Sequence, residues 1–203
     1  PCMSNHASAR VRVPLSIIIP TWNGQTVIGS SLAALASIKE RTVTIVDNAS
    51  ADCTIETARR ATPDVQTIAL SVNRGFAAAC NQGIRESNAP FILLLNQDAA
   101  VIPEGIAALL AHLERHPEFA AAGGIIQNPD GTLQPSMGPE IHPFRVALDR
   151  IPGLRTLLPS HVFRHHRWYQ AAREPAWLTG ACLLVRRAAF DDVGPFDEFY
   201  FMY

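Results

Sequence analysis

The sequence predicts an α/β fold with a mostly parallel sheet flanked by helices, and three patterns lead to that prediction. Short β-branched runs alternate with Ala/Leu-rich helical stretches in the first half of the 203 residues, as in the strand–helix units of parallel sheets. The run at residues 91–95 is apolar throughout, which is typical of a strand buried on both faces. Polar residues directly follow these runs, at the edge where open α/β sheets bind ligands.

The first two strand–helix units are expected near the N-terminus. Residues 15–20 contain three consecutive isoleucines and form the first expected strand. A Thr-Trp-Asn-Gly loop and a helix to about residue 38 follow it. Residues 42–46 predict the second strand, and Asp52 can cap a helix that ends at about residue 60. Two such units in succession predict parallel strands, because parallel neighbours need a crossover connection.

The alternation continues to about residue 127. The next expected elements are a strand, a helix and a strand at residues 65–70, 76–87 and 91–95. Pro103 and Glu104 open another helix, since proline suits a first helical turn and an acid complements the helix dipole. Residues 120–127 are apolar, and the Asn-Pro-Asp-Gly sequence at 128–131 predicts a turn.

The second part of the chain is less regular. Residues 138–175 are rich in Pro, His and Arg, and they predict a long, locally basic loop with one short helix. The histidines and arginines at 164–167 could suggest a metal or phosphate site, but adjacent histidines point in different directions and no third ligand has suitable spacing, so these side chains are expected to be solvated. Strand character returns at 177–186, and a short helix is expected at 188–193.

The two ends of the chain differ in character from the part between them. Residues 1–14 are expected to form a disordered leader, so that residues 15–203 make a single domain. The aromatic, strand-like run at 199–203 is an unusual terminus, because it leaves apolar surface uncovered. We therefore expect the domain to be truncated at its C-terminus.

Composition excludes several classes of partner. The formal net charge of −1 gives no global attraction to nucleic acid or to an anionic membrane. The four cysteines lack CxxC spacing, which argues against zinc and against a disulfide framework and predicts the reduced thiols of a cytoplasmic protein. No apolar run reaches the roughly 18 residues that a membrane span needs, and no signal peptide is recognisable.

Two acids follow expected strands directly. Asp98 ends the run Leu-Leu-Leu-Asn-Gln-Asp and is positioned for a ligand or a metal ion. Asp47 follows the second strand, where it can accept hydrogen bonds from a ligand. An Asx turn before the helix that Asp52 caps is the alternative for Asp47.

Six segments follow one another in a fixed order along the chain. They are Ser-Ile-Ile-Ile-Pro-Thr-Trp-Asn-Gly at 16–24, Ile-Val-Asp-Asn-Ala-Ser-Ala-Asp at 45–52, Asn-Arg-Gly-Phe-Ala-Ala-Ala-Cys-Asn-Gln-Gly at 73–83, Leu-Leu-Leu-Asn-Gln-Asp at 93–98, Trp-Leu-Thr-Gly-Ala-Cys at 177–182 and Phe-Asp-Glu at 196–198. Taken in order, they closely resemble the family 2 glycosyltransferases and especially their bacterial rhamnosyltransferase-like members. The preserved order makes chance agreement improbable.

The resemblance implies a GT-A fold and an inverting transfer of a sugar, with rhamnose as one candidate. The donor would be a dTDP- or UDP-linked sugar, and the acceptor a cell-surface polysaccharide or a lipid-linked glycan. It also implies a cytoplasmic protein, with peripheral association at the inner face of the plasma membrane as an option. Two alternatives stay open: a non-catalytic nucleotide-sugar binding module, and a nucleotidyltransferase. The Thr-Trp-Asn-Gly loop argues against the latter, because it lacks that class's Gly-rich, basic phosphate loop.

The resemblance also implies a nucleotide-binding set. Its members are Pro20, Thr21, Asn23, Asp47, Asn73, Gly75 and Asn81. Asp47 would receive the base or its ribose, and Gly75 would give the backbone the freedom to approach the donor. An ordinary turn is the alternative for the neighbouring Arg74, and a solvated helix face is the alternative for Asn81.

For Asp98 the resemblance implies a divalent cation, Mg²⁺ or Mn²⁺, that bridges the diphosphate. Asn96 occupies the position of the first acid of the family's Asp-x-Asp motif. Asp98 would therefore be the main protein ligand, with phosphate and water completing the shell. The alternative, that Asp98 caps the helix beginning at Pro103, requires too large a separation in sequence.

On the acceptor side the resemblance points to Trp177, Gly180 and Asp197. Trp177 can stack on a sugar ring or belong to the core. The general base of similar enzymes would lie just beyond Tyr203, and Glu198 would be a weak substitute for it. The base is therefore expected to be missing from this chain.

Overall fold

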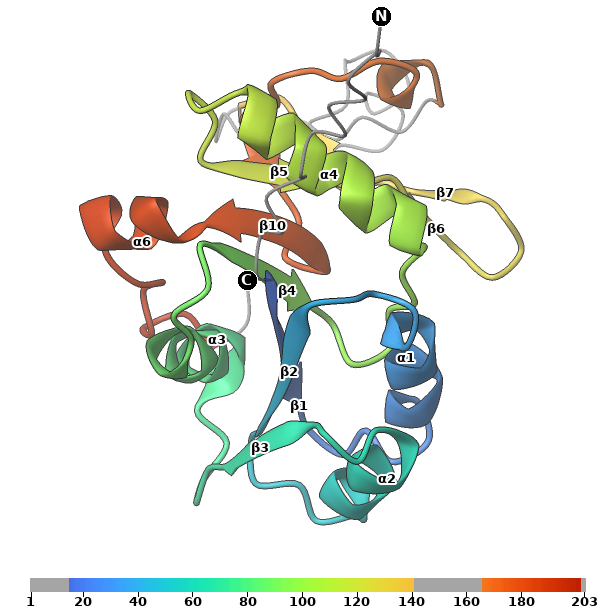
Figure 1. Ribbon diagram of the computed structural model, residues 1–203, viewed down its shortest axis with the longest axis vertical. Coiled ribbons are helices and arrows are strands. Elements are labelled where there is room, and N and C mark those ends of the chain that lie inside the picture. The colour runs from blue at the N-terminus through green and yellow to red at the C-terminus, as the bar shows by residue number, and fades with distance from the viewer. Residues whose placement is uncertain (1–14, 141–165, 202–203) are drawn as a thin grey trace, which may run out of the picture.

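The computed structural model of the chain describes residues 15–140 and 166–201 (Figure 1). The expected leader at 1–14, most of the expected loop at 138–175 and the end of the aromatic run lie outside these residues. Within the described part, no helix is long and apolar enough to cross a membrane.

A six-stranded sheet forms the centre, in the order β3-β2-β1-β4-β10-β5. Its strands are β1 (Leu15–Thr21), β2 (Arg41–Asp47), β3 (Gln66–Ala69), β4 (Phe91–Leu95), β5 (Ala121–Gly123) and β10 (Cys182–Arg186). The first four run parallel, and β10 is antiparallel to both of its neighbours. The prediction of a mostly parallel sheet flanked by helices is confirmed.

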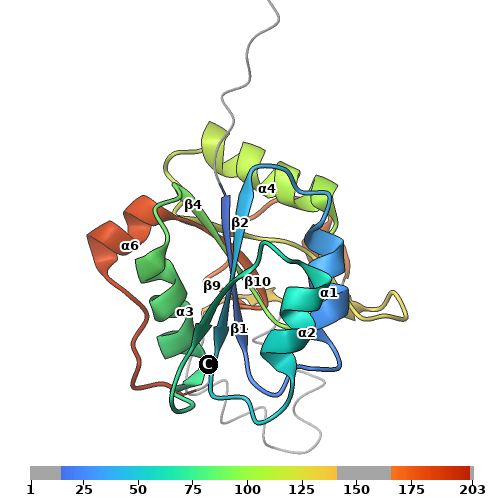
Figure 2. The same cartoon turned by 60° about the horizontal axis from the view of Figure 1, so that its bottom comes forward.

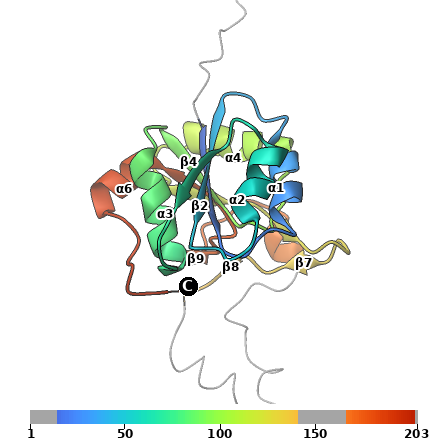
Figure 3. The ribbon, with the colours of Figure 1, turned by 90° about the horizontal axis from the view of Figure 1, so that it is seen from below.

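Helices cover both faces of the sheet. The three on one face are α1 (Ile28–Leu35), α2 (Thr54–Ala61) and α4 (Pro103–Arg115). The other face carries α3 (Gly75–Glu86) and α6 (Arg187–Val193), as Figures 2 and 3 show from two directions. This arrangement follows from βα crossovers, which place helices on the faces of a parallel sheet.

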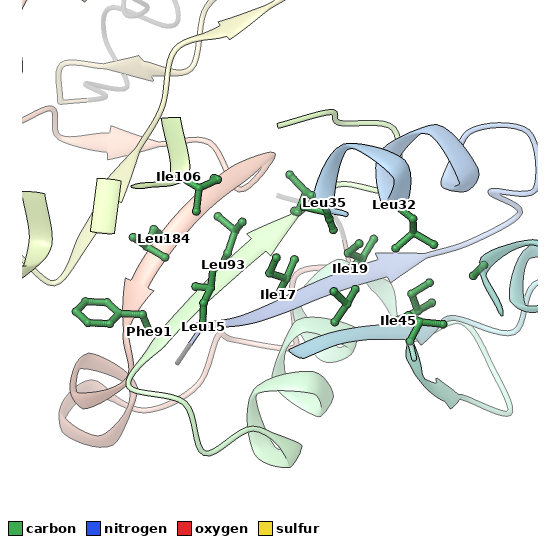
Figure 4. Close-up of a cluster of buried hydrophobic side chains, with 14 of the residues drawn as sticks. Leu15, Ile17, Ile19, Leu32, Leu35, Ile45, Phe91, Leu93, Ile106 and Leu184 are labelled. Atoms are coloured by element: carbon green, nitrogen blue, oxygen red, sulfur yellow. The ribbon is translucent and has the colours of Figure 1, made fainter. Parts of the chain in front are cut away.

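Each face has its own hydrophobic core, because successive strand residues point to opposite sides. In β1, Ile17 and Ile19 join the cluster under α1 and α4, which Figure 4 shows with Leu93 of β4. Ile18 points to the other side, toward the cluster under α3 that includes Cys80. Full burial of each such aliphatic side chain contributes roughly 1.5–3 kcal/mol.

Two adjacent arginines, the last residue of β10 and the first of α6, bind the two helical layers. Arg186 Nη2 donates to the carbonyl oxygen of Leu113 at 2.5 Å, at the C-terminal end of α4. Arg187 donates to the carbonyl oxygens of Ile84, at 2.7 Å, and of Ser87, at the end of α3. Cations at these positions satisfy the free carbonyls of a helix end and complement its dipole.

The structure corrects three of the expected elements. The run at 177–186 is two strands, β9 (Trp177–Leu178) and β10, because residues 179–181 leave the sheet and β9 pairs instead with β8 (Met137–Gly138). Residues 199–201 form no strand, since Asp197 accepts a hydrogen bond from Phe199 N and turns the chain. The N-cap of α2 is Cys53, although Asp52 Oδ1 does accept a hydrogen bond from Thr54 N, at 3.1 Å.

The segment after α4 also folds as smaller pieces. Residues 120–127 contribute β5 and β6 (Ile126–Gln127), and the expected turn at 128–131 connects β6 to β7 (Leu133–Gln134) as a hairpin. A 3₁₀ helix, η2 (His166–Tyr169), lies at the end of the expected long loop. The structure does not describe the side chains of residues 164–167.

Candidate functional site

Several of the predicted site residues lie where the parallel strands end. Thr21 and Asp47 are the last paired residues of β1 and β2, whereas pairing between β1 and β4 ends at Ile18 and Leu94. The strand order reverses at β1, because β2 lies on one side of it and β4 on the other. Ligands of open α/β sheets bind at such a switch point, outside the carboxyl ends of the strands.

The carboxylate of Asp47 is buried and bonded within this edge. Its Oδ1 accepts from Thr21 Oγ1 at 3.1 Å, and its Oδ2 accepts from Ser50 N at 2.9 Å. The Ser50 hydroxyl also donates to Oδ1. Asp47 therefore bonds its own loop three residues on, rather than two residues on as in an Asx turn. Three of the roughly four lone-pair positions of a carboxylate are occupied.

Asn23 joins the loop after β1 to the loop after β2. Its backbone N donates to Ser50 Oγ at 2.8 Å, and its Oδ1 accepts from Ala51 N at 2.8 Å. Asn23 has a φ of 49°, in the left-handed region that asparagine tolerates better than most residues. Pro20, which has no N–H to donate, lies beyond the last β1–β4 pair.

Gln97 connects β4 to β1 where their pairing has ended. Its side-chain amide bonds both backbone groups of Trp22, accepting from N at 3.0 Å and donating to O at 3.3 Å. A Cβ on Gly24 would lie 2.4 Å from Gln97 Oε1, so any side chain at this position would displace the Gln97 amide. Trp22 itself stays 54% exposed. Gln97 and Trp22 are site residues that sequence reasoning missed, because the contact joins residues 75 positions apart.

Asp98 lies beside this contact and differs from Asp47 in its surroundings. Its side chain is exposed and makes no hydrogen bond or ion pair with residues 15–140 or 166–201. The helix-cap alternative is wrong, since the N-cap of α4 is Ile102 and receives no side-chain cap bond. No cluster of three His, Cys, Asp or Glu side chains suited to a metal occurs in the described part of the chain.

The loop before α3 is held against the end of β2. Asn48, which follows Asp47, donates from Nδ2 to Gly75 O at 3.2 Å and accepts at Oδ1 from Arg74 N at 3.2 Å. Asn73 Oδ1 accepts from Gly75 N at 2.9 Å. Gly75 has a φ of +87°, so the backbone freedom expected of this glycine is used.

Asn81 does not lie on a solvated helix face, and that alternative is wrong. The residue is 1% exposed. Its amide donates to Phe196 O at 2.8 Å and to Glu198 Oε1 at 3.1 Å, and it accepts from Phe196 N at 2.9 Å. Asn81 therefore fixes the segment after α6 onto α3.

Of the predicted acceptor-side residues, Gly180 lies in a loop that approaches the same edge from the other side of β4. Ala181 O accepts from Asn96 N at 3.0 Å, which places the loop after β9 next to the loop that carries Asp98. A Cβ on Gly180 would lie 3.1 Å from the Phe76 ring, so glycine lets this loop pack against α3. Trp177 is half-buried, and its indole N–H is buried without an acceptor among the residues that the structure describes. Asp197 is exposed and caps the turn at Phe199.

The cysteines of the described residues are free thiols. Cys80 is a buried residue of α3, and burial raises the pKa of its thiol. Burial also raises the pKa of Cys182 to about 11. Cys53 is exposed.

Solved structures of glycosyltransferases share this fold. The mannosyltransferase PcManGT from Pyrobaculum calidifontis, in complex with GDP-Man and Mn²⁺, matches with a TM-score of 0.61 and 20% identity over 93% of this chain and 49% of that chain. S. aureus TarS 1–349 in complex with UDP matches with a TM-score of 0.62 and 18% identity over 93% and 51%. The sheet and its helices therefore form the GT-A fold of these enzymes.

Curated relatives match most of this chain. An N-acetylglucosaminyl-diphospho-decaprenol L-rhamnosyltransferase from Mycobacterium tuberculosis is 32% identical over 93% of this chain and 66% of its own length. The low-salt glycan biosynthesis hexosyltransferase Agl10 from Haloferax volcanii is 26% identical over 93% and 58%. The chain thus spans about two thirds or less of the length of these relatives. The family model described as glycosyl transferase family 2 matches residues 16–194, and the chain belongs to that family.

Proposed function

We propose that this chain carries the donor site of a sugar transferase that uses a nucleoside-diphosphate sugar. The observation that carries the proposal is Asp98, an exposed carboxylate without a partner among the described residues, at the sheet edge where β1 and β4 stop pairing. Unpaired carboxylates at the carboxyl edge of a parallel sheet are available to a ligand. Membership of glycosyl transferase family 2 supports a nucleotide sugar as that ligand.

The base and ribose would lie against the loops after β1 and β2. Asp47 keeps one lone-pair position for a ligand donor, and Thr21 and Asn23 hold the surrounding backbone in place. The exposed ring of Trp22, fixed through its backbone by Gln97, offers a flat surface for stacking. Asn73 and Gly75 would shape the loop that approaches the diphosphate.

A divalent cation, Mg²⁺ or Mn²⁺, fits the chemistry of Asp98. A single carboxylate agrees with a cation that takes most of its ligands from phosphate and water, as Mg²⁺ usually does. Asn96 is half-buried next to it and has an amide oxygen to offer. When bound, the cation would neutralise the leaving diphosphate. The Mn²⁺ complex of the Pyrobaculum mannosyltransferase supports a cation in this fold.

The transferred sugar and its acceptor are the finer part of the proposal. The mycobacterial relative is a rhamnosyltransferase named for a diphospho-decaprenol acceptor. We infer an inverting transfer of rhamnose from a dTDP- or UDP-linked donor to a lipid-linked or polysaccharide acceptor. Trp177, Gly180 and Asp197 would border the acceptor. Work at a lipid-linked acceptor favours a cytoplasmic protein that associates peripherally with the membrane.

Calorimetric titration tests the donor site directly, because nucleotide binding needs neither acceptor nor general base. We expect one of dTDP, UDP or GDP to bind in the presence of Mn²⁺ or Mg²⁺. Binding should weaken at least about tenfold in Asp98→Asn, or about 1.4 kcal/mol, since the variant replaces a charged cation ligand by a neutral one. Asp64→Asn removes an exposed acid after α2 and should bind like the wild type.

Two results would contradict the proposal. The donor site is refuted if no nucleotide binds with either cation, while the circular dichroism spectrum shows a folded chain. Unchanged binding in Asp98→Asn would remove the proposed metal role and leave the nucleotide site. Nucleotide binding by a protein that transfers no sugar to any lipid-linked or polysaccharide acceptor would favour the non-catalytic binding module.

A further inference from the structure

The carboxylate of Glu198 joins two parts of the chain that are far apart in sequence. Its Oε2 accepts from Arg74 Nη2 at 2.6 Å, and its Oε1 accepts from Asn81 Nδ2 at 3.1 Å. Arg85 Nη1 lies 3.8 Å from Oε1. The side chains of Arg74 and Glu198 are 49% and 32% exposed, so the ion pair is open to a ligand.

The loop before α3 is therefore held from two directions. On the β2 side, Asn48 bonds the backbone of Arg74 and Gly75 directly after Asp47. On the other side, Phe76 N donates to Phe201 O at 2.9 Å, and a Cβ on Gly75 would lie 2.3 Å from the same oxygen. A contiguous set of contacts runs from the proposed nucleotide edge to the segment at 196–201.

The ion pair with Glu198 constrains the side chain of Arg74, which is costly to order. An arginine has about 2 kcal/mol of rotamer entropy to lose, and a charge-assisted hydrogen bond is strong enough to reduce its freedom in advance. Arg74 uses its Nη2 to bond Glu198, and a guanidinium has five N–H donors in all. The remaining donors stay available to a planar or tetrahedral anion, for which the arginine fork is well suited.

We propose that Glu198 is a positioning residue of the donor site, which holds the Arg74 guanidinium ready for the diphosphate of the nucleotide ligand. The inference rests on the proposed function, because it needs a nucleotide at the edge formed by β1, β2 and β4. It also assigns a role to a carboxylate that is engaged with Arg74 and Asn81, which makes it a poor substitute base.

Charge-specific variants separate positioning from stability. Glu198→Gln keeps an amide oxygen for Asn81 but removes the charge that holds Arg74. We expect it to weaken nucleoside diphosphate binding about three- to fivefold, which corresponds to the upper range of a partly exposed ion pair. Binding of the corresponding nucleoside should stay unchanged, because it carries no phosphate for Arg74. Glu198→Asp should restore part of the loss, since it keeps the charge.

A double-mutant cycle with Arg74→Ala completes the test. If Glu198 acts through Arg74, adding Glu198→Gln to Arg74→Ala should cause no further loss. Glu118→Gln, which removes an exposed acid paired with His116, serves as the matched control and should bind like the wild type.

Each outcome is decisive. Equal weakening of nucleoside and nucleoside diphosphate in Glu198→Gln would indicate a merely structural role and overturn the inference. Additive losses in the double variant, or unchanged diphosphate binding in Glu198→Gln, would overturn it as well. A wild-type chain that binds no nucleotide would refute the proposed function, and this inference with it.

Discussion

Replacing Asn81 by alanine should release the segment after α6 from α3. The substitution removes three hydrogen bonds, two to Phe196 backbone groups and one to Glu198. Each bond contributes about 0.5–1.5 kcal/mol net. Because Phe196 and Glu198 are half-exposed, their freed groups regain water. We therefore expect a loss of roughly 2 kcal/mol, which is a drop in Tm of about 4–8 °C at this chain length.

Urea unfolding gives the free energy, and amide exchange followed by mass spectrometry localises the effect. Exchange should accelerate in the peptide covering residues 194–201 and stay unchanged in β1 and β4. Asn88→Ala is the matched control, since Asn88 is exposed and has no hydrogen bond through its side chain within the described residues. The reasoning is refuted if Asn81→Ala loses less than about 0.5 kcal/mol and the exchange of residues 194–201 does not change.

Two further predictions concern the end of β10 and the thiols. Arg187→Leu should lower the free energy of unfolding by about 2 kcal/mol, because carbonyls at the end of α3 lose charge-assisted bonds. Arg187→Lys should recover little of this free energy of unfolding relative to Arg187→Leu, since lysine has no planar fork. A full recovery of the melting temperature in thermal melts would contradict this. At pH 8, iodoacetamide should label Cys53 in the native chain and spare the buried Cys80 and the partly buried Cys182, whose raised pKa keeps both thiols protonated. Mass spectrometry of the labelled chain checks this, and fast labelling of Cys182 would disprove it.

The parallel half of the fold could be predicted because its strands are buried on both faces. A continuous apolar run marks such a strand, and the limits expected for residues 91–95 agree with β4. Asp47 and Asp98 could then be identified as candidate site residues, because they are acids that follow the expected strands. Their shared edge follows from parallel pairing alone.

The parts that could not be predicted depend on contacts between distant residues. The break between β9 and β10 reflects the pairing of β9 with β8 and the packing of Gly180 on Phe76. The spacing of apolar residues along the sequence contains no information about either contact. Asn81 has the polar character of a surface residue, and only its position opposite Phe196 makes it part of the interior.

The two arginines at the end of β10 have a consequence for the order of folding. The carbonyl groups at the ends of α4 and α3 obtain their cationic partners from residues 73 and 100 positions later in the chain. Both helix ends are therefore completed only when β10 joins the sheet between β4 and β5. Contacts of such large sequence separation form late. We expect the two helical layers to gain their final stability in one concerted step, because two consecutive residues, the last of β10 and the first of α6, serve both.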